Sequence, residues 1–116
     1  MDAQGWLSVS LTIPSTSSKR RLVKTEVNEA KRKVQTAFSD MFGGCTTTIG
    51  VGLWRGSLGV LVQEKVQIVS SYAPAEHWTQ HKAATLALAS SVCEALSQDC
   101  VLLSVCPVAE VYFAEA

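Results

Sequence analysis

Apolar and polar residues alternate along residues 6–13, near the start of the chain. The apolar side chains take every second position, at Leu7, Val9, Leu11 and Ile13. A period of two puts alternate side chains on opposite faces of a strand, so this segment predicts a half-buried β-strand. Pro14 and the four Ser and Thr residues after it end the strand and offer caps for a helix.

Two longer segments carry apolar residues at steps of three and four, the period of an amphipathic helix. The first helix is expected from Lys19 to Phe42, before Gly43-Gly44, with an apolar stripe of Val23, Val27, Ala30, Val34, Phe38 and Met41. The second is expected from Ala75 to Gln98, with an inner stripe of Trp78, His81, Thr85, Leu88, Val92 and Leu96. Its further alanines and leucines predict a second neighbour for this helix.

Residues rich in Val, Ile and Thr predict the remaining strands. A hairpin is expected from Cys45–Trp54 and Val60–Ser70, joined by a turn over residues 55–59. Val101–Val105 predicts a last strand, and Val108–Phe113 is a candidate for a short fifth strand at the C-terminus.

The order strand, helix, strand, strand, helix, strand resembles that of ferredoxin-like βαββαβ domains, which include the dimeric α+β-barrel proteins. The resemblance covers nearly the whole chain and rests on element order. It implies one α+β domain over residues 1–116, with a four-stranded antiparallel sheet and both helices on one face. A fold of this kind does not by itself define a function.

Packing of both helices on one face divides the strand residues into two groups. The core face is expected to hold the apolar residues of the first strand with Ile49, Val51, Leu53, Val101, Leu103, Val105, Val60, Val62, Glu64, Val66 and Ile68. Glu64 interrupts this series. In one interpretation, a bulge or strand bend turns it outward, or it lies partly exposed at the sheet margin. In the other, it is a buried or semi-buried carboxylate with a partner and a raised pKa, which serves as an acid, a base or a ligand anchor. The spacing along strand and helix argues against His81 as that partner.

The free face is expected to be polar, with Trp6, Ser8, Ser10, Thr12, Thr46, Thr48, Gly50, Gly52, Trp54, Gln63, Lys65 and Gln67. Glycines inside a strand leave room for a side chain, a ligand or another backbone. We therefore predict a small-ligand site formed by Thr48, Gly50, Gly52, Trp54 and Arg55. A wet sheet face and glycines that merely accommodate sheet twist are the simpler alternatives.

Composition narrows the class of protein. The chain has 116 residues with ten basic and ten acidic side chains, so its net charge favours neither nucleic acid nor an anionic membrane. No run approaches the roughly 20 apolar residues of a membrane span. The first five residues do not resemble a secretory signal, which makes the cytoplasm the expected location.

The cysteines and histidines do not indicate a metal site. Cys45, Cys93, Cys100 and Cys106 form no CxxC pair, and His77 and His81 lie outside zinc-finger spacing. All four cysteines are expected to be free and buried, and no metal or cofactor is expected. The chain also lacks GxGxxG, Walker A, HExxH and GxSxG motifs, and Cys45 has no identifiable base.

Three functional hypotheses remain. The first is a homo-oligomer, expected to be a dimer, that acts as a small binding or regulatory module with its ligand on the free sheet face. The second is a small enzyme of the dimeric-barrel type, with Glu64 as acid or base and Arg55 binding an anionic group. The third is nucleic-acid binding through basic residues of the first helix, which is disfavoured because the aromatic stacking platform of RNA-binding sheets is absent.

Overall fold

The computed structural model describes residues 5–56 and 58–115 and contains six regular elements. In chain order they are β1 (Trp6–Ile13), α1 (Lys24–Phe42), β2 (Thr46–Arg55), β3 (Leu61–Pro74), α2 (Ala75–Ala95) and β4 (Leu103–Pro107). Ser57, in the expected hairpin turn, lies outside the described residues. The element order is the one that the sequence predicts.

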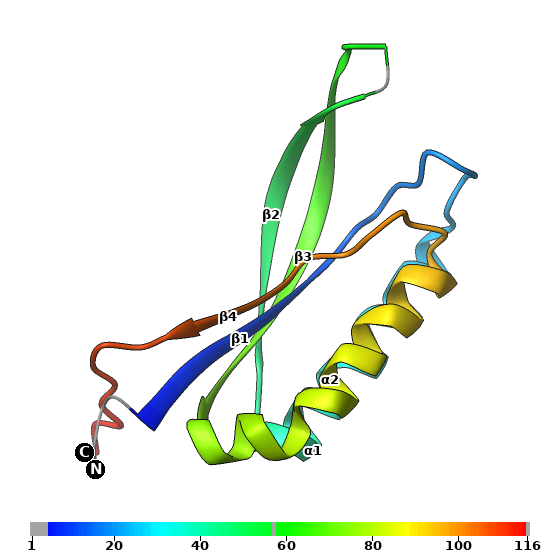
Figure 1. Ribbon diagram of the computed structural model, residues 1–116. Coiled ribbons are helices and arrows are strands. Elements are labelled where there is room, and N and C mark those ends of the chain that lie inside the picture. Colours follow the sequence, from blue (N-terminus) through cyan, green and yellow to red (C-terminus); the bar gives the residue numbers. More distant parts are fainter. Residues whose placement is uncertain (1–4, 57, 116) are drawn as a thin grey trace.

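The four strands form one antiparallel sheet in the order β2-β3-β1-β4, and both helices pack on the same face of it (Figure 1). This topology is that of a ferredoxin-like α+β domain, as expected. Residues 108 to 115 form no strand, so the candidate fifth strand is absent. Instead, the Val108 amide donates to the Trp6 carbonyl at 3.1 Å, and Phe113 packs on the Trp6 ring at a centroid distance of 5.2 Å.

The β2–β3 hairpin extends beyond the layer of helices (Figure 1). β3 pairs with β1 only over its second half, from Gln67 to Pro74. Its first half pairs with β2 alone, in the continuous register that joins Arg55 to Leu61 and Thr46 to Ser70. The outer part of the hairpin is therefore a two-stranded ribbon with no helix against it.

The core lies between the helices and the central part of the sheet. Val9, Leu11 and Ile13 of β1 are almost completely buried, as the alternation predicts. The helices add most of the stripes expected of them, but Val23 lies before α1 and is exposed. The buried helix-side residues are Val27, Ala30, Val34, Phe38, Phe42, Thr85, Leu88, Ala89, Val92 and Leu96. Burial of such side chains contributes about 1.5–3 kcal/mol each and provides most of the stabilisation.

The prediction of which β3 residues face the helices is wrong, because the other set of alternate residues does so. Leu11 is paired with Val69, and paired residues of an antiparallel ladder share a face, so Val69 points toward the helices. Ser71 and Ala73, at steps of two from Val69, are buried on the same side. The residues predicted to face the helices, namely Val62, Glu64, Val66 and Ile68, therefore lie on the opposite face, and Gln63, Lys65 and Gln67 lie on the helix side.

β2 has the expected orientation but not the expected burial. Ile49, Val51 and Leu53 are on the helix side of the hairpin, yet they are 67%, 64% and 59% exposed. They lie on the part of the ribbon that the helices do not reach. We call these three residues the hairpin strip.

The helices are shorter than predicted. α1 begins at Lys24, five residues later than expected, because the chain from Ser15 to Val23 is used as an ordered loop. Glu26 accepts a hydrogen bond from the Val23 amide at 2.7 Å and so satisfies a free donor at the helix start. α2 ends at Ala95, three residues before the expected end.

No helix in the described part of the chain is long and apolar enough to cross a membrane.

Candidate functional site

A cavity of about 270 Å³ lies where the hairpin passes the ends of β1 and α2. Its lining comes from three segments far apart in sequence: the β1–α1 loop, the β2–β3 hairpin and the α2–β4 connection. The lining residues are Thr16, Ser18, Trp54, Glu64, Ser97, Gln98, Asp99 and Cys100. We call this hollow the Glu64 cavity.

The register of the sheet brings these segments together. Ile13 is paired with Gln67, and three further steps along both strands place Thr16 opposite Glu64. Glu64 is in turn paired with Gly52 on its other side. Strand pairing ends at Ile13, and beyond it the Ser15 and Thr16 amides donate to the Glu64 side chain and not to the backbone of β3. The Gln98 amide group donates to the Thr16 carbonyl at 2.7 Å.

The Glu64 carboxylate is held by the loop after β1. Its Oε2 accepts hydrogen bonds from the Ser15 amide at 3.2 Å, the Thr16 amide at 2.8 Å and the Thr16 hydroxyl at 2.5 Å. The Ser15 hydroxyl also donates to the Lys65 carbonyl at 2.5 Å. Glu64 is therefore half-buried and has defined hydrogen-bond partners, which agrees with a semi-buried carboxylate that has a partner. Its role as an acid, a base or a ligand anchor stays a prediction.

All three donors to Glu64 are neutral. In residues 5–56 and 58–115 no cationic side chain forms an ion pair with this carboxylate, and the cavity lining contains no Lys, Arg or His. The second acid of the lining, Asp99, is paired with Lys19 at 3.1 Å at exposed positions. Of the two carboxylates that line the cavity, Asp99 therefore has a cationic partner, and Glu64 has none among the described residues.

The predicted site residues divide into two groups. Trp54 is on the same face of the hairpin as Glu64, and both line the cavity. Arg55 points to the other face and donates to the Gly59 carbonyl at 2.8 Å, away from the cavity. Thr48 is exposed on the Trp54 face but does not line the cavity. The structure therefore brings together Trp54 and Glu64, and not Trp54 and Arg55.

The space left by the two strand glycines is filled from within the hairpin. A Cβ atom at Gly50 would meet the Val66 side chain at 3.5 Å, and one at Gly52 would meet it at 3.3 Å. Val66 is consequently buried although it lies on the free face. These glycines accommodate a neighbouring valine, and neither of them lines the Glu64 cavity. Ligand binding at Gly50 and Gly52 stays a prediction.

Sequence reasoning missed six of the eight lining residues, namely Thr16, Ser18, Ser97, Gln98, Asp99 and Cys100. The sequence pattern predicts helix caps at residues 15–18, because they follow a strand and precede a helical pattern. A possible signal was the length of that polar segment, since a single cap needs one residue and four were present. The His81 side chain packs edge-on against Phe42 at a centroid distance of 5.9 Å, so a Glu64–His81 dyad is not formed.

The free face of the sheet carries a row of hydroxyl groups. Ser104, Ser10, Ser70 and Thr46 are opposite one another across all four strands. The two central serines share a hydrogen bond of 2.8 Å. This part of the free face is polar, as the sequence predicts.

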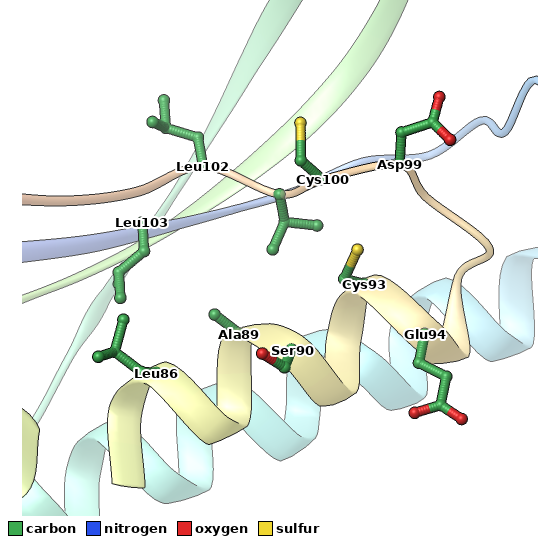
Figure 2. A pocket seen from close by; sticks show the side chains of 10 residues that line it. Leu86, Ala89, Ser90, Cys93, Glu94, Asp99, Cys100, Leu102 and Leu103 are labelled. Carbon is green, nitrogen blue, oxygen red and sulfur yellow. The ribbon is translucent and has the colours of Figure 1, made fainter. Parts of the chain in front are cut away.

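A second hollow of about 570 Å³ runs between α2 and the segment that leads into β4. Figure 2 shows Leu86, Ala89 and Cys93 on the helix side of this α2 groove, with Leu103 pointing toward them. Cys100 and Leu102 point away from the helix in the same view. Cys100 and Asp99 line both the α2 groove and the Glu64 cavity, so the two hollows adjoin.

The four cysteines are free, as predicted, but not all are buried. Cys45 and Cys93 are half-buried, whereas Cys100 and Cys106 are exposed. The exposed pair lies on β4 and the segment before it, at the edge of the sheet, where one side of the strand has no neighbour. Among the described residues no group of three or more His, Cys, Asp or Glu side chains is arranged to hold a metal ion.

The basic residues of α1 are mixed with acidic ones in space. Arg32 and Lys33 border a shallow hollow together with Glu29 and Asp40. Lys33 donates to the Ser91 hydroxyl of α2 at 2.9 Å. Nucleic-acid binding through this helix stays an untested prediction.

Comparison with known proteins gives structural neighbours only. No protein family and no curated protein sequence matches this chain. Among solved structures, the divalent cation tolerance protein CutA1 from Thermus thermophilus is 14% identical, with a TM-score of 0.58 over 92% of this chain and 87% of that one. CutA1 from Pyrococcus horikoshii is 13% identical, with a TM-score of 0.58 over 91% and 86% of the two chains.

A phage enzyme has a similar fold. A phage SAM lyase, solved in complex with S-methyl-5'-thioadenosine, is 17% identical to this chain, with a TM-score of 0.63 over 97% of this chain and 91% of that one. At these identities the likeness establishes the fold and nothing more. The small α+β architecture and its ferredoxin-like topology are thereby confirmed.

Proposed function

We propose that this chain is a homo-oligomer that binds S-adenosylmethionine in the Glu64 cavity and cleaves the bond between its sulfonium sulfur and its aminobutyrate chain. The observation that carries the proposal is the Glu64 carboxylate, fixed by neutral donors beside the Trp54 indole in a cavity lined by no cationic side chain. The substrate supplies the positive charge that this cavity lacks.

The chemistry of the lining favours an organic cation over an anion. A carboxylate attracts a positive charge strongly where water is partly excluded, and an indole face adds cation–π attraction of about 0.5–2 kcal/mol. S-adenosylmethionine carries a sulfonium and an ammonium group, together with an adenine that can stack on an aromatic ring. The enzyme hypothesis with Arg55 as an anion-binding group loses its support, because Arg55 is directed to the hairpin turn.

The choice of this cation draws on the phage SAM lyase with a similar fold and its bound S-methyl-5'-thioadenosine. That thioether is what remains of S-adenosylmethionine when the bond from sulfur to the aminobutyrate carbon breaks and sulfur keeps the electron pair. In the proposed step the substrate's own carboxylate oxygen bonds to that carbon as sulfur leaves, so the second product is a lactone and no further reactant is needed. The sulfur centre loses its positive charge in the reaction. In this proposal Glu64 binds the cationic substrate more strongly than the neutral thioether product.

Self-association is proposed because the hairpin leaves apolar surface and a strand edge uncovered. The hairpin strip is more than half exposed, and β2 is an edge strand with no charged residue from Thr46 to Trp54. Natural edge strands usually carry charges, proline or a bulge that prevents pairing, and β2 has none of them before Arg55, its last residue.

The decisive experiment is incubation of the purified full chain with S-adenosylmethionine, followed by chromatography and mass spectrometry. Formation of S-methyl-5'-thioadenosine is expected from the parent protein and not from Glu64→Gln. The matched control is Asp99→Asn, which removes the other cavity carboxylate, already paired with Lys19. Binding of S-adenosylmethionine without turnover would reduce the proposal to a binding module. Absence of both binding and turnover would refute it.

A further inference from the structure

The loop after β1 has more contacts to Glu64 than a simple connection needs. Thr16 is exposed, yet both its amide and its hydroxyl donate to the same carboxylate oxygen. Both bonds end on a carboxylate oxygen, and hydrogen bonds to a charged group are shorter and stronger than neutral ones. Two of them from one residue therefore fix the orientation of this carboxylate.

The position of Thr16 is fixed in turn from the other side. Gln98 donates from one Nε2 atom to the Thr16 carbonyl at 2.7 Å and to the Leu96 carbonyl at 2.9 Å. Leu96 is completely buried at the end of α2, so it anchors Gln98 to the core. A continuous series of hydrogen bonds thus connects the end of α2 through Gln98 and Thr16 to Glu64.

This series of hydrogen bonds restricts the orientation of the Glu64 carboxylate. Oε2 is occupied by the loop, and within the described residues no hydrogen bond is recorded for Oε1. Rotation of the carboxylate would break all three bonds to Oε2. The oxygen available to a ligand in the cavity is therefore Oε1, presented in one orientation.

We infer that Thr16 is a positioning residue for Glu64 and that Gln98 locks Thr16 in place. This inference rests on the proposed function, in which Glu64 meets the positive charge of the ligand. Preorganisation of this kind matters because a group that is already oriented needs no reorganisation when charge changes in the site. In this inference, the role of the ordered loop between β1 and α1 is to place Thr16 next to the hairpin.

The test compares Thr16→Val, Thr16→Ser and Gln98→Ala with the parent chain. Valine keeps the shape and the amide but loses the hydroxyl, and serine restores the hydroxyl. We expect Thr16→Val to lower kcat/KM for S-adenosylmethionine about tenfold, the loss typical of one charge-assisted hydrogen bond, and Thr16→Ser to restore it. Gln98→Ala should act in the same direction, since it frees the loop.

Ser17→Ala is the matched structural control. The Ser17 hydroxyl donates to the Ser97 carbonyl at 2.6 Å, so it ties the same loop to the same α2–β4 connection without touching Glu64. We expect Ser17→Ala to leave kcat/KM unchanged. Parent-like kcat/KM in Thr16→Val would overturn the inference. It would equally be overturned if Ser17→Ala and Thr16→Val lowered Tm and kcat/KM together by similar amounts.

A ligand-independent measurement separates failure of this inference from failure of the proposed function. In ¹H–¹⁵N spectra of the free protein, Glu64→Gln should move the Ser15 and Thr16 amide proton resonances upfield, because each loses a charged acceptor. Gln98→Ala should broaden or shift the same two resonances. If both changes occur while S-adenosylmethionine is neither bound nor cleaved, the positioning holds and the proposed substrate is wrong. Unchanged resonances in Glu64→Gln would disprove the positioning.

Discussion

Trp54 and Glu64 are on neighbouring strands and share one face of the hairpin, because Gly52, the residue paired with Glu64, lies two positions before Trp54. The indole and the carboxylate therefore border the same cavity, one from β2 and one from β3. Gly52 has no side chain, and Val66 packs against it from the neighbouring strand. This arrangement is the basis of the ligand predictions below.

The indole of Trp54 should contribute an aromatic face to the cationic ligand. Trp54→Leu is expected to weaken S-adenosylmethionine binding about three- to tenfold, the effect of losing a cation–π contact of about 1 kcal/mol. Trp54→Phe, which keeps an aromatic ring, should retain most of the affinity. Isothermal titration calorimetry of the three proteins measures the difference. Equal affinities for the leucine and parent proteins would show that the indole does not face the ligand.

The rate at which Cys100 reacts with a thiol reagent should depend on whether a ligand occupies the Glu64 cavity. It is exposed and lines the Glu64 cavity, whereas Cys106 is exposed and lies beside Ser8 at the far end of β4. Saturating S-adenosylmethionine should slow N-ethylmaleimide labelling of Cys100 and leave labelling of Cys106 unchanged. Peptide mass spectrometry over a time course measures both rates in one sample. Equal slowing of both thiols would indicate a general change and contradict a local site.

The sequence could predict the fold because its strongest patterns coincide with the buried half of the sheet. Val9, Leu11 and Ile13 alternate cleanly, and β1 is flanked on both sides by other strands under two helices. β3 was assigned the wrong face because apolar residues occur on both of its faces. Val66 is buried by packing on the hairpin glycines, while Val69 is buried by the helices. Periodicity alone cannot distinguish these two kinds of burial.

Two of the eight residues that line the cavity could be identified from the sequence. Trp54 is the one aromatic residue of β2 and Glu64 interrupts an apolar series in β3, and both were singled out. Thr16 and Gln98 were not, since they are polar residues in loops more than 80 positions apart, and only the strand register brings them together. The contribution of a loop to a site depends on where its flanking strands lie in the sheet, which no local pattern encodes.

The hairpin strip should drive self-association. Replacing Ile49, Val51 and Leu53 by threonine keeps β-propensity and removes exposed apolar surface, so it is expected to shift the protein toward monomer. Sedimentation velocity at micromolar concentration compares the triple variant with the parent chain. Val23→Thr, at a 56% exposed valine before α1, is a control of the same chemical type and should not change the assembly. A monomeric parent chain would contradict the role of the strip.

An ion pair at the start of α1 should make part of the stability depend on pH. Arg20 donates to both carboxylate oxygens of Glu26, at 2.9 Å and 3.0 Å, and also to the Ala95 carbonyl at 2.9 Å. The pair therefore joins the start of α1 to the end of α2. The hydrogen bond from Arg20 and then the one from the Val23 amide hold the pKa of Glu26 below its ordinary value of 4.5.

The sign of the pH effect follows from this lowered pKa. The unfolded chain binds a proton at Glu26 more readily than the folded chain does, because the pKa of Glu26 is lower in the folded state. The contribution of ionised Glu26 to folding stability is therefore complete above about pH 4.5, and it is lost as the pH falls through the pKa of the folded state. Tm should therefore decrease more steeply between pH 5 and pH 3 in the parent chain than in Glu26→Gln. Glu29→Gln, one turn later on α1, is the control and should retain the parent slope. If Glu26→Gln and the parent chain lose Tm in parallel over this range, the two-point contact with Arg20 does not persist in solution.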